Sequence, residues 1–135
     1  LSRGLGDVYK RQEVPPAILK YLEELKKEYR ILILSNTNPY VMSWACSTEF
    51  SSEGKPLTHY ADRLYLSYQI GYTKPAPEIF RHLIDDSGIC PEEALFVDDG
   101  ASNVKKGEES GFHTFCPANG SDWRSDLSAL LQRLG

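Results

Sequence analysis

Two short apolar runs, each followed directly by polar residues, place the strongest constraint on the fold of this chain. The runs lie in ILILSNTN (residues 31–38) and ALFVDDGASN (residues 94–103). A continuous apolar run is typical of a buried strand in a parallel sheet, and such sheets carry functional side chains at the carboxyl ends of their strands. The polar tips are Ser35-Asn36-Thr37 and Asp98-Asp99, and we expect both tips to lie at one edge of a sheet.

Strand-like and helix-like segments alternate along the chain. Strands are expected at residues 31–34, 63–67, 95–97 and 112–115, and a loop at 51–58. Helices are expected to begin at residue 15 or 16, 39, 75 or 76, 102 and 122, and to end at 29, 50, 86, 110 and 134. This order predicts an α/β fold: a Rossmann-like parallel sheet in three layers, α/β/α. The length of 135 residues suits one domain.

A third motif, GYTKPAPEIF (residues 71–80), places Lys74 between the two tips in sequence. Pro75 pushes Lys74 into extended geometry, so the backbone aims its side chain. A hydroxyl with an amide, a cation and a carboxylate pair together make a site for a phosphate and a divalent metal ion. Adjacent carboxylates repel one another unless a cation relieves them, and Mg²⁺ takes oxygen ligands. The alternative for Lys74 is a solvated surface lysine.

The other site residues also have purely structural interpretations. Asp98-Asp99 could cap the helix that follows, and Asn103 could be an ordinary first-turn residue of that helix rather than one that orients the metal loop. For the acid pair we prefer the metal site, whereas for Asn103 both interpretations stay open.

Residues 35–38 divide between two roles. Thr37 and Asn38 could cap the helix that begins at Pro39, and for these two residues we prefer capping. For Ser35 and Asn36 we prefer phosphate binding at the strand-to-helix turn. The three histidines, His59, His82 and His113, have no metal-ligand spacing and are interpreted as structural.

In order and spacing, these motifs resemble the haloacid dehalogenase-like (HAD) hydrolase superfamily, in its sugar-phosphatase-like branch. Over roughly residues 13–135, Ser35 matches the second motif of the family, Lys74 the third and Asp98-Asp99 the fourth. The resemblance implies a Mg²⁺-dependent phosphatase that acts on a small phosphorylated metabolite, for example a sugar phosphate, through an aspartyl-phosphate. It also implies that Asp99 binds the metal directly, that Asp98 acts indirectly or through water, and that Ser35 and Lys74 hold phosphoryl oxygens.

The first motif of the family, D-x-D-x-[TV], is missing, and no D-x-D occurs anywhere in the chain. The resemblance places the strand that bears this motif in the centre of the sheet, between the strands that end at Ser35 and Asp98. We therefore expect two parallel half-sheets, gapped or pressed together, without the central first strand and the cap domain. We also expect no phosphatase turnover from the chain as it stands.

The N-terminal segment SRGLGDVYKRQ (residues 2–12) reads as the in-frame translation of a transposase sequencing adapter, and all eleven residues fit. A natural polar tail is the alternative. The expected organisation is an adapter-derived artefact at residues 1–12 and the C-terminal part of a HAD-like core domain at residues 13–135.

The amino-acid composition argues against some classes of binding partner. The formal charge is −4, and it becomes −6 without residues 1–12, which argues against nucleic acid or an anionic membrane as a partner. No apolar run approaches the ~18 residues of a membrane span. Cys46, Cys90 and Cys116 are widely spaced, which favours reduced thiols in a cytoplasmic protein.

Three rival functions are weighed against the phosphatase. A metal-independent 2-haloacid dehalogenase is disfavoured by the acid pair Asp98-Asp99. A receiver-type signalling domain is rejected because its acid pair comes first in the chain, whereas here the pair comes last. A non-catalytic HAD-like binding module stays open, since this sequence contains no nucleophile motif.

Overall fold

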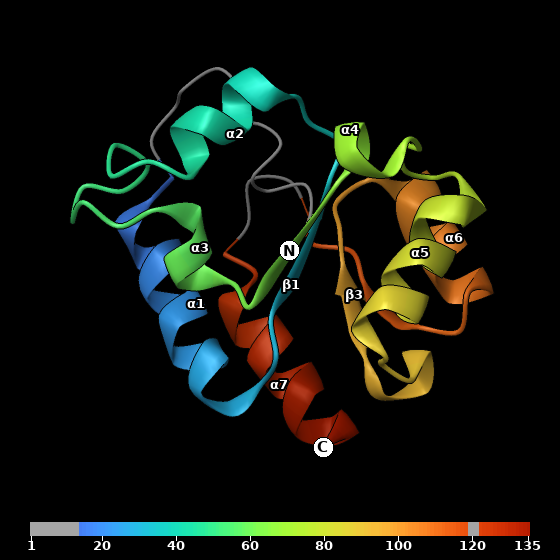
Figure 1. Cartoon of the computed structure of the whole chain (residues 1–135). Coiled ribbons are helices and arrows are strands. Elements are labelled where there is room, and N and C mark those ends of the chain that lie inside the picture. Colours follow the sequence, from blue (N-terminus) through green and yellow to red (C-terminus); the bar gives the residue numbers. More distant parts are fainter. Residues whose placement is uncertain (1–13, 119–121) are drawn as a thin grey trace.

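The computed structural model of the chain describes residues 14–118 and 122–135, in which helices and strands alternate as expected (Figure 1). Within these residues the strands are β1 (Leu32–Ser35), β2 (Arg63–Leu66), β3 (Leu95–Val97) and β4 (His113–Phe115). The helices are α1 (Pro16–Glu28), α2 (Pro39–Ala45), α3 (Leu57–Tyr60), α4 (Ser67–Ile70), α5 (Pro77–Ser87), α6 (Ala101–Glu109) and α7 (Arg124–Leu134), with a 3₁₀ turn, η2 (Pro91–Glu93).

The strands of the described residues form two separate parallel sheets of two strands each. β1 pairs with β2 in the register Leu32↔Arg63 to Ser35↔Leu66. β3 pairs with β4 from Leu95↔His113 to Val97↔Phe115. The predicted pair of parallel half-sheets is therefore confirmed, and β1 and β3 are their inner strands.

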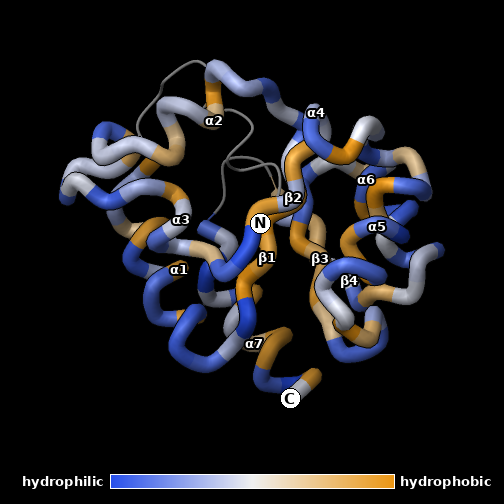
Figure 2. Tube along the Cα trace, viewed as in Figure 1, coloured by the Kyte–Doolittle hydropathy of each residue, from blue (hydrophilic) through white to orange (hydrophobic). Residues whose placement is uncertain are grey.

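Successive residues of β1 face opposite sides and enter two different clusters of buried side chains. Ile33 belongs to a first cluster with residues of α1, α2 and α3, whereas Leu34 belongs to a second cluster with residues of α5. The second cluster also contains Phe96 of β3 and Phe112, so α5 spans both half-sheets. Figure 1 shows α1, α2 and α3 on one side of the strands and α5 and α6 on the other. Hydrophobic residues follow the strands between these layers (Figure 2).

The C-terminal helix α7 lies in the same layer as α1. The hydroxyl of Tyr21 donates to the carbonyl oxygen of Arg124 at 3.2 Å and lies 2.7 Å from the hydroxyl of Ser128. The rings of Tyr21 and Trp123 meet edge to face, with centroids 6.0 Å apart. The predicted three-layer arrangement is confirmed: the layer of α1 and α7 and the layer of α5 enclose the strands.

Three short helical segments differ from the sequence prediction. α2 ends at Ala45 instead of residue 50, because the hydroxyl of Ser47 donates to the carbonyl oxygen of Trp44 at 2.6 Å and closes a turn. α3 begins inside the predicted loop, and α4 was not predicted at all. Helices of four residues are too short to show a hydrophobic period, so the sequence pattern does not reveal them.

Candidate active site

The first predicted phosphate-binding residue, Ser35, is the last residue of β1 and is only 2% exposed. It pairs in register with Leu66, the last residue of β2. The tips of both strands thus lie at the same edge, and the next residues, Asn36 and Ser67, begin the polar part of the site.

Asn36 holds the backbone of Lys74. Its Oδ1 accepts a hydrogen bond from the backbone N–H of Lys74 at 2.8 Å, and its Nδ2 donates to the carbonyl oxygen of Lys74 at 3.2 Å. Both halves of the amide are therefore engaged with one residue 38 positions away in sequence. The side chain of Asn36 positions Lys74, and direct phosphate binding by Asn36 stays a prediction.

The next two residues, Thr37 and Asn38, have structural roles. Oδ1 of Asn38 accepts from the backbone N–H of Val41 at 3.0 Å, which confirms the predicted capping of α2. Thr37 is held through its backbone instead: its N–H donates to Oγ of Ser67 at 2.9 Å, and the same hydroxyl donates to its carbonyl oxygen at 3.2 Å. Ser67 was not predicted as a site residue, because its partner is 30 residues away.

Lys74 and Asp98 form a buried ion pair. Nζ of Lys74 lies 3.0 Å from Oδ2 of Asp98, and the two side chains are 3% and 0% exposed. The interpretation of Lys74 as a solvated surface residue is therefore wrong. Charges removed from water in this way are compatible with folding only when they are paired and hydrogen-bonded. The contact also shows that the tips of the two half-sheets converge at one edge, since Asn36 of one sheet holds the lysine that pairs with Asp98 of the other.

The second carboxylate oxygen of Asp98 is also engaged. Oδ1 accepts a hydrogen bond from the backbone N–H of Gly100 at 2.8 Å, and Nδ2 of Asn103 lies at 3.5 Å from Oδ1 and 3.4 Å from Oδ2. The long distances make the Asn103 contacts weak. Asn103 lies in the first turn of α6 and its amide faces Asp98, whereas a role in orienting a metal loop stays a prediction.

Gly100 is a site residue that the sequence analysis missed. A Cβ atom at this position would lie 3.0 Å from Nδ2 of Asn103 and 3.2 Å from Oδ1 of Asp98. A side chain here would therefore crowd the loop that carries the acid pair. The glycine between DD and ASN in the sequence is the only signal that could have indicated this close approach.

The acid pair divides into two different environments. Asp98 is 1% exposed and both of its oxygens contact protein groups, whereas Asp99 is half-buried. Since Lys74 already compensates Asp98, the repulsion between the two acids does not by itself require a metal ion. Among the described residues no three side chains of His, Cys, Asp or Glu gather to hold a metal. Mg²⁺ is commonly bound by only one or two carboxylates, with phosphate oxygens and waters as the other ligands, and Asp99 fits that mode.

The histidines lie elsewhere. His82 is exposed on α5, with its ring centroid 6.1 Å from that of Tyr65, and His113 is exposed on β4. No helix of the described residues is long and apolar enough to cross a membrane.

Comparison with known proteins gives consistent matches. The family model for haloacid dehalogenase-like hydrolase matches residues 5–111. The D-ribitol-5-phosphate phosphatase of Bacteroides thetaiotaomicron is 61% identical over 119 residues, which cover 88% of this chain and 58% of that protein. The structure of a predicted HAD-like family hydrolase from Porphyromonas gingivalis superposes with a TM-score of 0.85 at 44% identity, covering 90% of this chain and 59% of the other.

A second similar structure was solved with bound ligands. A variant of a HAD family enzyme from Bacteroides thetaiotaomicron, in complex with magnesium and inorganic phosphate, has a TM-score of 0.79 and 37% identity over 86% of this chain and 59% of the other. The chain thus spans less than two thirds of the length of these relatives. The family model nevertheless covers most of the chain, together with the residues that form the polar edge. This chain belongs to the haloacid dehalogenase-like hydrolase family.

Proposed function

We propose that residues 13–135 supply the phosphate-holding and metal-holding part of a Mg²⁺-dependent phosphomonoesterase. The observation that carries the proposal is the buried Lys74–Asp98 pair at 3.0 Å, which assembles the tips of two half-sheets into one site. The relative crystallised with magnesium and inorganic phosphate supports the same ligands for this chain.

The proposed roles follow the geometry. Lys74 contacts the transferring phosphoryl group while it pairs with Asp98, because an ammonium can donate three hydrogen bonds. Ser35 holds a phosphoryl oxygen with its hydroxyl, and Asn36 fixes the backbone of Lys74. Asp98 orients the lysine and the loop, and Asp99 is the carboxylate that would bind the metal. When bound, Mg²⁺ neutralises charge on the phosphoryl oxygens.

The nucleophile of the proposed reaction is an Asp outside the present sequence, since the chain contains no D-x-D. That carboxylate would attack phosphorus, the bond from phosphorus to the alcohol oxygen would break, and water would hydrolyse the aspartyl-phosphate. A phosphorylated sugar or sugar alcohol is the proposed substrate class, because a relative that is 61% identical is a D-ribitol-5-phosphate phosphatase.

The first test uses the chain joined to an upstream segment that carries the first motif. The enzyme should require Mg²⁺, and Asp99→Asn should weaken metal binding and rate together, because it removes a ligand charge. Lys74→Ala should lower the rate by roughly two orders of magnitude or more. His82→Ala, at an exposed position on α5, should leave the chemical step nearly unchanged. Hydrolysis of phosphate esters in EDTA at the Mg²⁺ rate would show that the metal assignment is wrong.

The second test uses the chain as it stands. Incubated with p-nitrophenyl phosphate and Mg²⁺, it should release no p-nitrophenol, because the covalent step has no nucleophile. Turnover that survives re-purification and disappears in Asp99→Ala would overturn this expectation. Removal of residues 1–12, which we propose to be adapter-derived, should leave the binding of Mg²⁺ and inorganic phosphate unchanged.

A non-catalytic binding module is the second candidate, favoured by the absence of D-x-D from the sequence. One measurement distinguishes the two candidate functions. If the chain joined to a D-x-D-containing segment binds Mg²⁺ and phosphate but hydrolyses no phosphate ester, the binding module is the better description.

A further inference from the structure

The backbone pairing of β1 with β2 ends at Ser35 and Leu66. The residue that follows β2, Ser67, begins the short helix α4, which ends at Gly71 with a φ of 92°. The backbone N–H of Gly71 donates to the carbonyl oxygen of Ser67 at 2.8 Å. Strand pairing therefore stops just before the polar edge, so other contacts must hold the two segments together there.

Two side chains make such contacts, one from each segment. The amide of Asn36 binds both backbone groups of Lys74, the N–H at 2.8 Å and the carbonyl oxygen at 3.2 Å. The hydroxyl of Ser67 binds both backbone groups of Thr37: it accepts from the N–H at 2.9 Å and donates to the carbonyl oxygen at 3.2 Å. We call these four hydrogen bonds the reciprocal clamp, because each segment holds one residue of the other.

The side chain of Thr37 does not fix its own position. Within the described part of the chain, Oγ1 of Thr37 is buried and has no hydrogen-bond partner. The cap of α2 is Asn38, so the predicted capping role does not occupy this hydroxyl either. The hydroxyl of Ser67 is therefore the side-chain group that fixes the backbone of Thr37.

The contacts of the clamp lead from Ser67 to the buried ion pair. The hydroxyl of Ser67 holds Thr37. The preceding residue, Asn36, holds Lys74, whose Nζ lies 3.0 Å from Oδ2 of Asp98. Since Asn36 and Thr37 share a peptide bond, a displacement of Thr37 would be passed on to Lys74.

We propose that Ser67 is a positioning residue for phosphoryl transfer. Through the backbone of Thr37 it sets the relative positions of Ser35 and Lys74, so that both contact one phosphoryl group. Alignment of this kind governs the rate, since a displacement of about 1 Å can cost on the order of a hundredfold. The inference rests on the proposed phosphatase function, and Ser67 acts in it without touching the phosphoryl group or the metal.

Ser51 provides a matched control for a merely structural role. It is a buried serine like Ser67, and its Oγ accepts a hydrogen bond from the backbone N–H of Lys55 at 2.9 Å. It lies in the loop between α2 and α3, outside the polar edge. Ser67→Ala and Ser51→Ala should each lower the midpoint of thermal unfolding by about 2–8 °C, because each loses a buried hydrogen bond. A difference between the two variants in rate or in exchange then reports position and not stability.

The first measurement uses the chain as it stands. Amide hydrogen exchange, followed by NMR, reports the N–H of Thr37 and the N–H of Lys74 separately. In Ser67→Ala both amides should exchange about tenfold faster or more, whereas Ser51→Ala should leave both close to the parent rates. Faster exchange at Lys74 is the decisive result, because this amide donates to Asn36 and not to Ser67.

The second measurement uses the chain joined to an upstream segment that carries the first motif, with p-nitrophenyl phosphate and Mg²⁺. Ser67→Ala should lower kcat about tenfold or more and change KM less than about threefold, because misalignment affects the transition state more than substrate binding. Ser67→Thr keeps the hydroxyl and should retain at least about a third of the parent kcat. Ser51→Ala should keep kcat within about twofold of the parent value.

Four results would overturn the proposal. They are an unchanged kcat in Ser67→Ala, an equal loss of kcat in Ser51→Ala, a Ser67→Thr enzyme as slow as Ser67→Ala, and unchanged exchange at the amide of Lys74 in Ser67→Ala. A parent enzyme that hydrolyses no phosphate ester would reject the proposed function itself, and this inference with it. Failure of the inference alone is recognised by an active parent enzyme.

Discussion

At the scale of single residues, the site depends on contacts between positions that are distant in sequence. The sequence indicated Ser35, Asp98 and Asp99 because they follow strand-like runs, and it indicated Lys74 because Pro75 fixes its geometry just before a predicted helix. It did not indicate that the amide of Asn36 would bind the backbone of Lys74, since that contact depends on how two loops meet. Residue types and strand tips were predictable, whereas the different burial of Asp98 and Asp99 depends on tertiary contacts that the sequence pattern does not reveal.

The Lys74–Asp98 pair should be essential for stability. Lys74→Met removes the charge but keeps an unbranched side chain, and it leaves Asp98 buried without its cation. We expect a loss of about 3–5 kcal/mol in the free energy of unfolding, measured by urea titration, or an unfolded chain if that exceeds the total stability. Adding Asp98→Asn should restore part of the loss, because the buried charge is then gone.

Lys55→Met is the matched control for this prediction. Nζ of Lys55 lies 3.7 Å from Glu23 and 3.6 Å from Glu53, and its side chain is 40% exposed. Exposed pairs of this kind contribute at most about 1 kcal/mol, so the variant should unfold close to the parent chain. Equal losses in Lys55→Met and Lys74→Met would contradict the special role of the buried pair.

Asp122 offers a test of local electrostatics. The side chain of Arg124 donates to both of its oxygens, at 2.9 and 2.8 Å, and lowers the pKa of Asp122 to about 2. Since the pKa is lower in the folded chain than in the unfolded one, this contact stabilises the fold above pH ~4 and ceases to do so as the pH falls through about 2. Carbon NMR of the carboxyl should show this midpoint, and Arg124→Gln should raise it. An unchanged midpoint in that variant would contradict the assigned cause.

At the scale of elements, the strands were easier to predict than the short helices. β3 (Leu95–Val97) was predicted at its observed residues, and β1 is shifted by one residue. The reason is physical: a buried parallel strand must be apolar on both faces, and that pattern survives in three or four residues. The ends of α2 and the existence of α4 depend instead on individual side-chain contacts, such as those of Ser47 and Ser67.

Gly107 of α6 is a packing residue that the sequence pattern did not single out. A Cβ atom there would lie 2.7 Å from Cδ2 of Phe96 on β3. Gly107→Ala should therefore destabilise the chain, because overpacking costs about 1–3 kcal/mol and exceeds the gain in helix propensity of at most about 1 kcal/mol. Glu108→Ala, exposed on the same helix, should change stability by no more than about 0.5 kcal/mol. Thermal unfolding of both variants measures this, and a Gly107→Ala chain more stable than the parent would reject the close contact.

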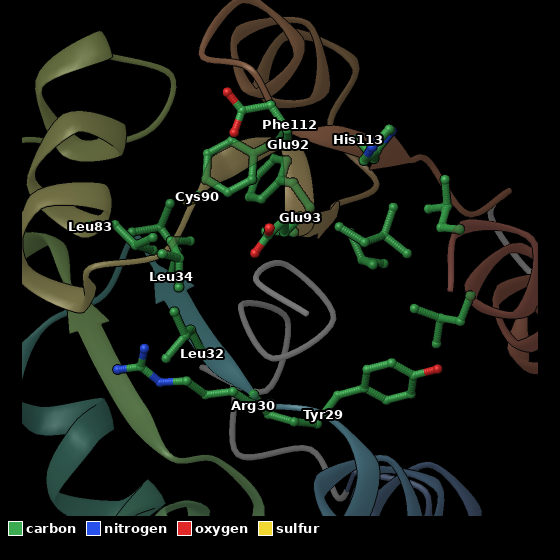
Figure 3. Close-up of a pocket in the computed structure, with 18 of the residues that line it drawn as sticks. Tyr29, Arg30, Leu32, Leu34, Leu83, Cys90, Glu92, Glu93, Phe112 and His113 are labelled. Carbon is green, nitrogen blue, oxygen red and sulfur yellow. The ribbon is translucent and has the colours of Figure 1, made fainter.

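At the scale of the whole molecule, the two half-sheets are packed by different clusters of buried side chains. The first cluster of buried residues lies over β1 and β2 alone, whereas the second reaches both half-sheets through α5. A cavity of about 560 Å³ is lined by residues of both β1 and β3 (Figure 3). The sequence predicted two halves from the absence of one motif. The sequence could not predict the distance between the two half-sheets, because that distance depends on the packing of α5 and α7.

The division into two half-sheets should make this chain weakly stable and prone to association. A sheet of only two strands is marginally stable by itself, and a large apolar cavity forfeits packing contacts. Analytical ultracentrifugation should show association that grows with concentration, and unfolding should occur at a low midpoint. A monomer that unfolds cooperatively at an ordinary midpoint, about 45–65 °C, would contradict this expectation.

The register of the two half-sheets also has a consequence for the order of folding. β1 and β2 pair residues 31 positions apart, from Leu32 to Arg63, and β3 and β4 pair residues 18 positions apart, from Leu95 to His113. The entropy of closing these two loops differs by only about 0.5 kcal/mol, so each half-sheet can form on its own at a similar cost. The contacts from Asn36 to Lys74 and from Lys74 to Asp98 then join the halves. We therefore expect the polar edge to be completed late, when two separately formed halves dock.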